Sequence, residues 1–234
     1  MPEFGAAFAE ALSLVIRLDR DLAEIVWLSL EVSLAAVFLA TLIGMPLGAA
    51  VALFHFPGRK AVIVGVNALM GLPPVVVGLI VYLSLSRAGP FGVFGMLFTP
   101  AALIAAQVLL VFPIIAALTR QVVEDLWAEY SDQLRSFGAG PGRALTALLW
   151  DGRFTLLTAV LAGFGRASAE VGAVMIVGGN IDHVTRVMTT AIALEVRKGD
   201  LALALGLGVI LMALSLIVNG AAFLIKDTVE TRYG

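Results

Sequence analysis

Cysteine is absent from the chain, and histidine is scarce. Without cysteine the chain can form no disulfide, bind no metal through thiolates and use no cysteine nucleophile. The two histidines, His55 and His183, lie far apart in the sequence, so no histidine pair has the spacing of a zinc site. No lysine follows a glycine, so the Gly-Lys-Ser/Thr end of a Walker A loop is also missing. We therefore expect no metal, no cofactor and no ATPase centre in this chain.

Charged residues are few as well, at 14% of the 234 residues, whereas 60% are hydrophobic. The mean hydropathy of +1.01 lies outside the balance of a soluble domain and indicates an all-α integral membrane protein. A bilayer crossing needs roughly 20 apolar residues, so the chain has room for about five or six spans. We expect one transmembrane domain over residues 1–234, and no nucleic-acid-binding face is indicated.

Apolar runs predict five transmembrane helices, at about residues 25–54, 61–85, 96–118, 154–177 and 201–225. Helices are expected because lipid offers no partner for unpaired backbone groups. Residues 1–22 alternate apolar and charged positions, which favours an interfacial amphipathic helix, and they lack the pattern of a cleaved signal peptide. Residues 187–196 are apolar but too short to span, so a short surface helix is expected there.

The distribution of Lys and Arg gives the expected orientation. If the polar segment after the third span is cytoplasmic, that side carries Arg59, Lys60, Arg120, Arg135, Arg143, Arg153, Lys226 and Arg232. The other side carries Arg17, Arg20, Arg87, Arg186, Arg197 and Lys198. This bias of eight to six favours an external N-terminus and a cytoplasmic C-terminus.

Glycine and proline together interrupt two of the predicted spans, and Pro113 is an isolated breaker in the third. Gly44 and Pro46 fall in the first span, and Pro73 and Pro74 fall in the second. Proline removes an intrahelical hydrogen bond and clashes with the preceding turn, so we expect these helices to kink or partly unwind. Such breaks either mark moving parts or reflect the ordinary frequency of glycine and proline in membrane helices.

The predicted fourth span carries two opposite charges, Arg166 and Glu170, four residues apart on one helical face. Charge in the bilayer is costly, which leaves two interpretations: an arginine on an anion path, or a neutralised pair that locks helices together. We favour the lock, because Glu170 cancels the field that an anion would need. The candidates for a pathway or gate are Pro73, Pro74, Gln107, Arg166, Glu170 and the turn Gly178, Gly179 and Asn180.

A polar segment of residues 119–153 separates the third and fourth spans. It is too polar to cross a membrane and too long for a simple turn. Apolar residues at helical spacing predict a helix over residues 122–134, and Pro141 is expected to start a second that reaches Trp150. Gly138 and Gly140 should form an elbow between the two helices.

This segment resembles that of permease subunits of ATP-binding-cassette importers, in which Glu-Ala-Ala, three residues and Gly precede an Ile-x-Leu-Pro element. Residues 132–138, Asp-Gln-Leu-Arg-Ser-Phe-Gly, fit the spacing, and Leu148 takes the isoleucine position, although the alanines and the proline are missing. Residues 72–79 and 164–172 are similar to the molybdate and sulfate branch of these permeases. Residues 177–181 and 185–192 look most like tungstate permeases.

The resemblance implies a type I importer permease with five transmembrane helices and a cytoplasmic coupling helix. The family's coupling positions correspond to Asp132, Gln133, Leu134, Arg135, Ser136, Phe137, Gly138 and Gly140. The implied partners are a second copy of the chain, two cytoplasmic ATPase subunits that hold ATP and Mg, and an external binding protein. The implied function is import of a tetrahedral oxyanion across a prokaryotic cell membrane, with tungstate favoured over molybdate or sulfate.

Two other classes compete with this interpretation. A secondary transporter or channel also uses broken helices and buried charge, but it predicts an internal repeat or an unneutralised coupling carboxylate. An intramembrane enzyme needs a serine-histidine, paired-aspartate or histidine-glutamate arrangement at matching depth, which the sequence does not offer.

Overall fold

The computed structural model describes residues 20–233, and all its regular structure is helical over that range. The helices are α2 (Arg20–Leu53), α3 (Arg59–Met70), α4 (Pro74–Leu85), the 3₁₀ turn η1 (Gly92–Phe94), α5 (Pro100–Ser136), α6 (Pro141–Asp151), α7 (Arg153–Ser168), α8 (Gly172–Gly178), α9 (Met188–Lys198) and α10 (Leu201–Tyr233). The predicted interfacial helix over residues 1–22 lies almost entirely outside the described residues.

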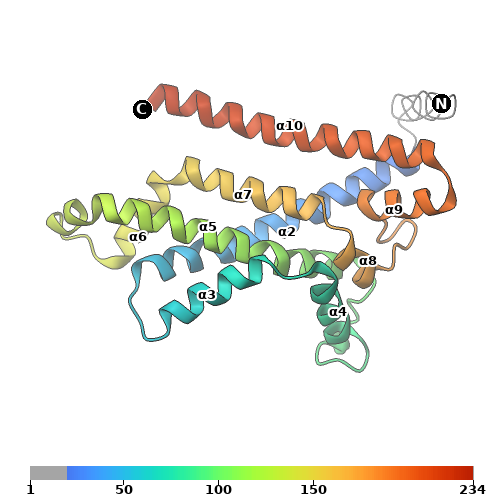
Figure 1. The fold of residues 1–234 in the computed structure, drawn as a ribbon, viewed down its shortest axis with the longest axis horizontal. Helices are drawn as coiled ribbons and strands as arrows, with labels where there is room; N and C mark the ends of the chain where they lie inside the picture. The colour runs from blue at the N-terminus through green and yellow to red at the C-terminus, as the bar shows by residue number, and fades with distance from the viewer. Residues whose placement is uncertain (1–19, 234) are drawn as a thin grey trace.

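Helices α2, α5, α7 and α10 run along the long axis of the molecule, and α4 lies across it (Figure 1). The most extensive helix contact is that of α2 with α5, where small residues let the backbones approach. A Cβ atom added at Gly44 would lie 3.1 Å from the Phe112 carbonyl oxygen. Glycine at this position therefore sets the distance between the two central helices.

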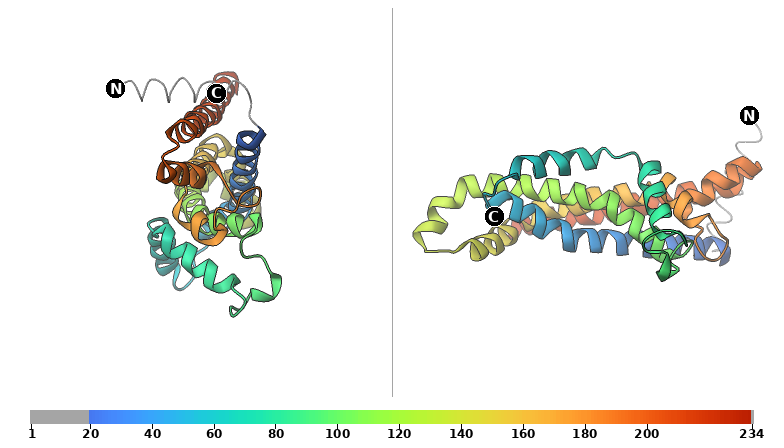
Figure 2. Two further views of the ribbon diagram at one scale, coloured as in Figure 1. Left: turned by 90° about the vertical axis from the view of Figure 1, so that its right-hand side faces the viewer. Right: turned by 90° about the horizontal axis from the view of Figure 1, so that it is seen from below.

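Three helices, α2, α5 and α10, are long and apolar enough to cross a membrane. The number rises to five if each of two bent pairs forms one span, namely α3 with α4, bent by 102°, and α6 with α7, bent by 73°. Figure 2 shows α3 folding back beside the bundle before the chain turns into α4. The prediction of an all-helical, multi-pass membrane protein is confirmed.

The two predicted proline breaks have different outcomes. The second predicted span does break: α3 ends at Met70 with Gly71 as its C-cap, and α4 begins at Pro74 after Pro73. The first does not unwind: α2 runs from Arg20 to Leu53 with Pro46 inside it. Proline removes only one hydrogen bond, and the close packing of Gly44 on α5 holds this part of α2 as a helix.

Two further boundaries differ from the prediction. The fourth span is not one helix over 154–177, since α7 ends at Ser168 and α8 begins at Gly172. The helix predicted over 122–134 is not separate, since α5 continues through it to Ser136. No proline or glycine lies between Leu118 and Ser136, so nothing in the backbone ends the helix there. The short helix predicted over 187–196 is confirmed as α9.

Large apolar side chains remain exposed along the outside of the helices. On α4 the exposed set is Val75, Val76, Leu79, Ile80 and Leu83, and α3 has no buried residue. Monomeric soluble proteins rarely expose contiguous apolar patches of this kind. These surfaces suit contact with lipid or with another protein in the membrane.

Candidate functional site

The glycine elbow lies at one end of the bundle, where α5 passes into α6 (Figure 1). Gly138 has a left-handed φ of 67°, its N–H donates to Arg135 O at 2.9 Å, and Ala139 N–H donates to Leu134 O at 2.9 Å. This pair of bonds is a Schellman motif, which satisfies the last carbonyls of α5. Gly138 is thus the residue whose backbone ends α5, whereas Gly140 has an ordinary φ of −70°.

The predicted coupling residues form an exposed end of the molecule. Those with exposed side chains or backbone are Asp132, Gln133, Arg135, Ser136, Phe137, Gly138 and Gly140, and Leu134 is half-buried. Phe137 is 86% exposed, which is unusual for an aromatic residue. The elbow therefore presents an apolar tip among polar neighbours.

A small core lies beneath the elbow and fixes its direction. Leu148 of α6 is buried with Val123 of α5, and Leu134 packs against the same cluster. The Arg135 guanidinium lies over the Trp127 ring, 5.6 Å from its centre. The elbow is consequently attached to the bundle on one side and open on the other.

An ion cluster that the sequence analysis did not identify lies on the same half of α5. Arg59 donates to Val51 O at 2.7 Å, to Ala52 O at 3.2 Å and to Glu124 Oε1 at 2.5 Å. Arg120 donates to the other oxygen of Glu124. The cluster joins the end of α2, the start of α3 and α5. The spacing of Arg120 and Glu124 signals their pair, but no local pattern indicates Arg59.

The second group of candidates surrounds the break between α7 and α8. Glu170 is 3% exposed; its Oε2 accepts from Arg166 Nη1 at 2.8 Å and its Oε1 from Ala173 N–H at 2.9 Å. Its backbone carbonyl accepts from Thr189 Oγ1 of α9 at 2.8 Å. One glutamate thereby ties the last turn of α7, the first turn of α8 and α9. The positive charge of Arg166 is paired within this arrangement.

Gln107 and the proline pair lie near the same break. Gln107 Nε2 donates to Ala167 O, in the last turn of α7, at 3.3 Å. Helix α4, which begins at Pro74 after Pro73, packs on α8: a Cβ atom added at Gly78 would lie 2.7 Å from the Ala173 Cα. The structure thus brings Pro73, Pro74, Gln107, Arg166 and Glu170 into one neighbourhood.

The turn at Gly178, Gly179 and Asn180 lies at the far end of α8 from that break. Gly179 and Asn180 have φ angles of 67° and 51°, and Thr185 Oγ1 donates to Gly178 O at 2.5 Å while accepting from Ile181 N–H at 3.0 Å. Thr185 is fully buried and was missed by the sequence analysis. The turn is held by this hydroxyl and faces the end of the bundle opposite to the elbow (Figure 1).

An exposed contact joins the following loop to α2. His183 Nδ1 lies 2.9 Å from Glu24 Oε2. The hydrogen bond and charge of Glu24, with the charge of Asp182, raise the pKa of His183 above its ordinary value. Among the side chains that the structure describes, those of residues 20–221 and 224, no group of three or more His, Asp or Glu could hold a metal ion.

Comparison with known proteins places the chain among membrane permeases, although no family model matches it. It is 41% identical over 220 residues to a probable anion ABC transporter permease protein of Haloferax volcanii, covering 91% of this chain and 94% of that protein. It is 35% and 36% identical to tungstate uptake system permease proteins of Peptoclostridium acidaminophilum and Campylobacter jejuni, covering 97% and 94% of this chain and 100% and 92% of those proteins. A sulfate transport system permease protein of Synechocystis is 26% identical over 92% of this chain and 79% of its own length. The chain therefore belongs to the permease proteins of ABC-type anion transporters.

Proposed function

We propose that this chain is the membrane-spanning subunit of an ATP-driven importer for a tetrahedral oxyanion, with tungstate as the favoured substrate. Tungstate is favoured as the substrate because the chain is similar to two tungstate uptake permeases over almost its whole length. The sulfate permeases are more distant, at 25–26% identity. Molybdate and sulfate remain the alternatives within the same class.

The ATPase is supplied by separate subunits, which hold ATP and Mg, because this chain lacks a Walker A loop. We assign the elbow around Gly138 as the surface to which the ATPase subunits bind. The exposed ring of Phe137 and the packed core beneath it support this assignment, since a coupling surface must be both accessible and firmly attached. An external binding protein delivers the anion.

We propose that two copies of the chain form the transmembrane part and that the elbow faces the cytoplasm. The excess of Lys and Arg on the elbow side supports this orientation, which places the N-terminus and the 178–187 turn outside the cell. The unpartnered apolar side chains of α4 offer surface for a second copy.

The break between α7 and α8 is our candidate for the moving part of the pathway. Its supporting observation is that Glu170 joins α7, α8 and α9 there, while Gln107 of α5 bonds to the end of α7 and α4 packs on α8 at Gly78. Arg166 is part of this hinge rather than a free anion site, because its charge is paired with Glu170.

Affinity purification of the tagged chain from its native membrane tests this function. We expect a stoichiometric complex with a Walker-containing ATPase, and calorimetry on the binding protein encoded beside it should rank tungstate above molybdate and sulfate. Purification of the chain alone, with ion flux through liposomes that contain no ATPase, would support a secondary transporter or channel instead.

A further inference from the structure

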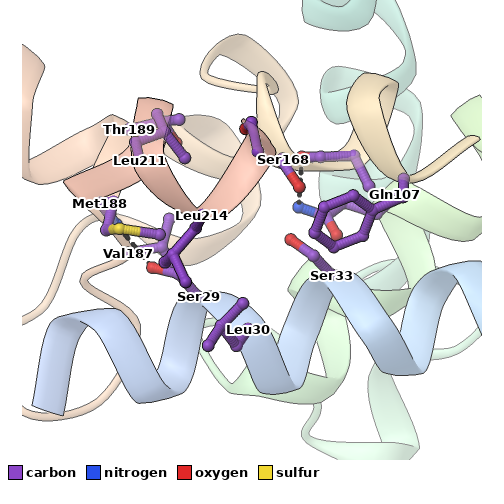
Figure 3. A pocket seen from close by; sticks show the side chains of 13 residues that line it. Ser29, Leu30, Ser33, Gln107, Ser168, Val187, Met188, Thr189, Leu211 and Leu214 are labelled. Carbon is purple, nitrogen blue, oxygen red and sulfur yellow. Dashed lines mark hydrogen bonds between the residues drawn. The ribbon is translucent and has the colours of Figure 1, made fainter. Parts of the chain in front are cut away.

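A small, partly enclosed cavity lies where α2, α5, α7, α9 and α10 meet (Figure 3). Its volume is about 20 Å³, and its polar lining consists of the hydroxyl side chains of Ser29, Ser33, Ser168, Thr189 and Ser215 and the amide of Gln107. No charged side chain lines it. Such a lining inside a membrane protein favours a small neutral polar ligand.

One acceptor in this lining has no partner. Gln107 is 3% exposed, and its Nε2 donates to Ala167 O at 3.3 Å. A backbone carbonyl can only accept, so this bond fixes which end of the amide faces Ala167 and directs Oε1 elsewhere. Oε1 accepts no hydrogen bond from the described side chains, those of residues 20–221 and 224, or from the described backbone. A buried acceptor left in this state costs roughly 1–3 kcal/mol.

The volume of the cavity limits the ligand to the size of a water molecule. A site must offer about 10–15 Å³ to hold one water molecule, together with two or more polar partners. The cavity meets the first condition with room for one water. Figure 3 shows the Ser33 side chain pointing from α2 toward Gln107 on α5, which supplies a second polar partner.

We propose that one ordered water molecule occupies this cavity, donates a hydrogen bond to Gln107 Oε1 and bridges to Ser33 Oγ. The water joins α2 to α5 beside the end of α7. This inference is independent of the transported anion.

Radiolytic hydroxyl-radical labelling of the intact transporter tests the proposal, because a bound water generates radicals inside the protein. Phe164 and Met188 line the cavity and are 4% and 3% exposed, so radicals from bulk water do not reach them. We expect both to be labelled in the wild type. Absence of label on both would overturn the proposal.

Variants distinguish a bound water molecule from a direct hydrogen bond between Ser33 and Gln107. Gln107→Leu removes the acceptor and Ser33→Val fills the cavity, and each should abolish labelling of Phe164. Ser84→Ala is the matched control, because the Ser84 hydroxyl bonds to Ile80 O on the surface of α4, and it should leave the labelling unchanged.

A second measurement covers the case in which these variants do not fold. A wild-type density map at a resolution that shows waters should contain one within hydrogen-bond distance of Gln107 Oε1. A direct bond from Ser33 Oγ to Gln107 Oε1 in that map, or unchanged labelling in a folded Gln107→Leu, would contradict the proposal.

Discussion

At the scale of single residues, Gly138 carries the sharpest expectation, since its φ of 67° is one that other residues adopt at a cost of roughly 1–2 kcal/mol. A Cβ atom there would meet no neighbour, so the cost is purely one of backbone conformation. We predict that Gly138→Ala lowers ATP-driven transport severalfold and leaves helix content unchanged, measured by uptake and circular dichroism.

Two variants control the Gly138 prediction. Gly140→Ala should transport normally, because Gly140 has a φ of −70° and open space around it. Gly138→Asn should recover part of the activity, because asparagine tolerates the left-handed region. Full transport by Gly138→Ala would show that the elbow has no part in the coupling mechanism.

Glu170 is predicted to matter for stability through both of its oxygens. Glu170→Ala leaves Arg166 and the Ala173 N–H without their acceptor and should cost roughly 1–3 kcal/mol. Glu170→Gln retains an acceptor for Ala173 N–H and should cost less. Thermal unfolding in detergent gives the ranking, with Glu31→Gln on the exposed face of α2 as control. Equal stability of Glu170→Ala and wild type would contradict the hinge assignment.

His183 should make the loop after α8 sensitive to pH. Glu24 raises the pKa of His183 above 6.5, with Asp182 and Asp21 acting in the same direction, while nearby Arg186 is paired to Asp182. A raised folded-state pKa stabilises the fold below pH 6.5, and that contribution is lost as pH rises through the folded-state value.

The thermal stability of wild type relative to His183→Gln should therefore be greater at acidic than at alkaline pH. Glu24→Gln should flatten this difference, since it removes the largest cause of the shift. If the difference in thermal stability between wild type and His183→Gln stayed the same at all pH values between about 5 and 9, the contact of His183 with Glu24 would not titrate.

At the scale of helices, the contact of α4 with α8 leaves no room for an added methyl group at Gly78. A Cβ atom at Gly78 would lie 2.7 Å from the Ala173 Cα, which is backbone and cannot rotate away. We predict that Gly78→Ala destabilises the protein by about 1–3 kcal/mol. Gly65→Ala on α3 is the control, because no atom lies within 4 Å of its added Cβ. If Gly78→Ala and Gly65→Ala had the same unfolding midpoint, this packing of α4 on α8 would be ruled out.

The helices that the sequence predicted correctly are those whose apolar runs are long and end at clear signals. The double proline at 73–74 predicted the break before α4, and Pro141 correctly marked the start of α6. Composition and the lipid argument were sufficient for the all-helical class.

The features that escaped prediction depend on contacts between distant residues. The break at Ala169 follows from the Glu170 carboxylate accepting from the Ala173 N–H, which an apolar run does not reveal. The continuity of α2 at Pro46 depends on its packing against α5. The salt bridge of Arg59 with Glu124 joins residues 65 apart in the sequence. The hydrophobic periodicity of the sequence indicates none of these three contacts.

At the scale of the whole molecule, α5 is the element that joins the two candidate regions. It is one helix of 37 residues, about 55 Å long at 1.5 Å per residue, with Gln107 near one end and the elbow at the other. If the elbow is the coupling surface that we propose, α5 is the continuous helix through which a movement at Gly138 would reach the break between α7 and α8. The Arg59 and Glu124 cluster ties the end of α2 and the start of α3 to the same helix.

Uptake of labelled tungstate into proteoliposomes is the measurement that tests this account most directly. The chain is reconstituted with its ATPase, and its binding protein is added outside. We predict uptake that requires ATP inside, requires the binding protein and falls severalfold in Gly138→Ala. Tungstate flux through the chain alone, unaffected by the ATPase or by Gly138→Ala, would contradict the account.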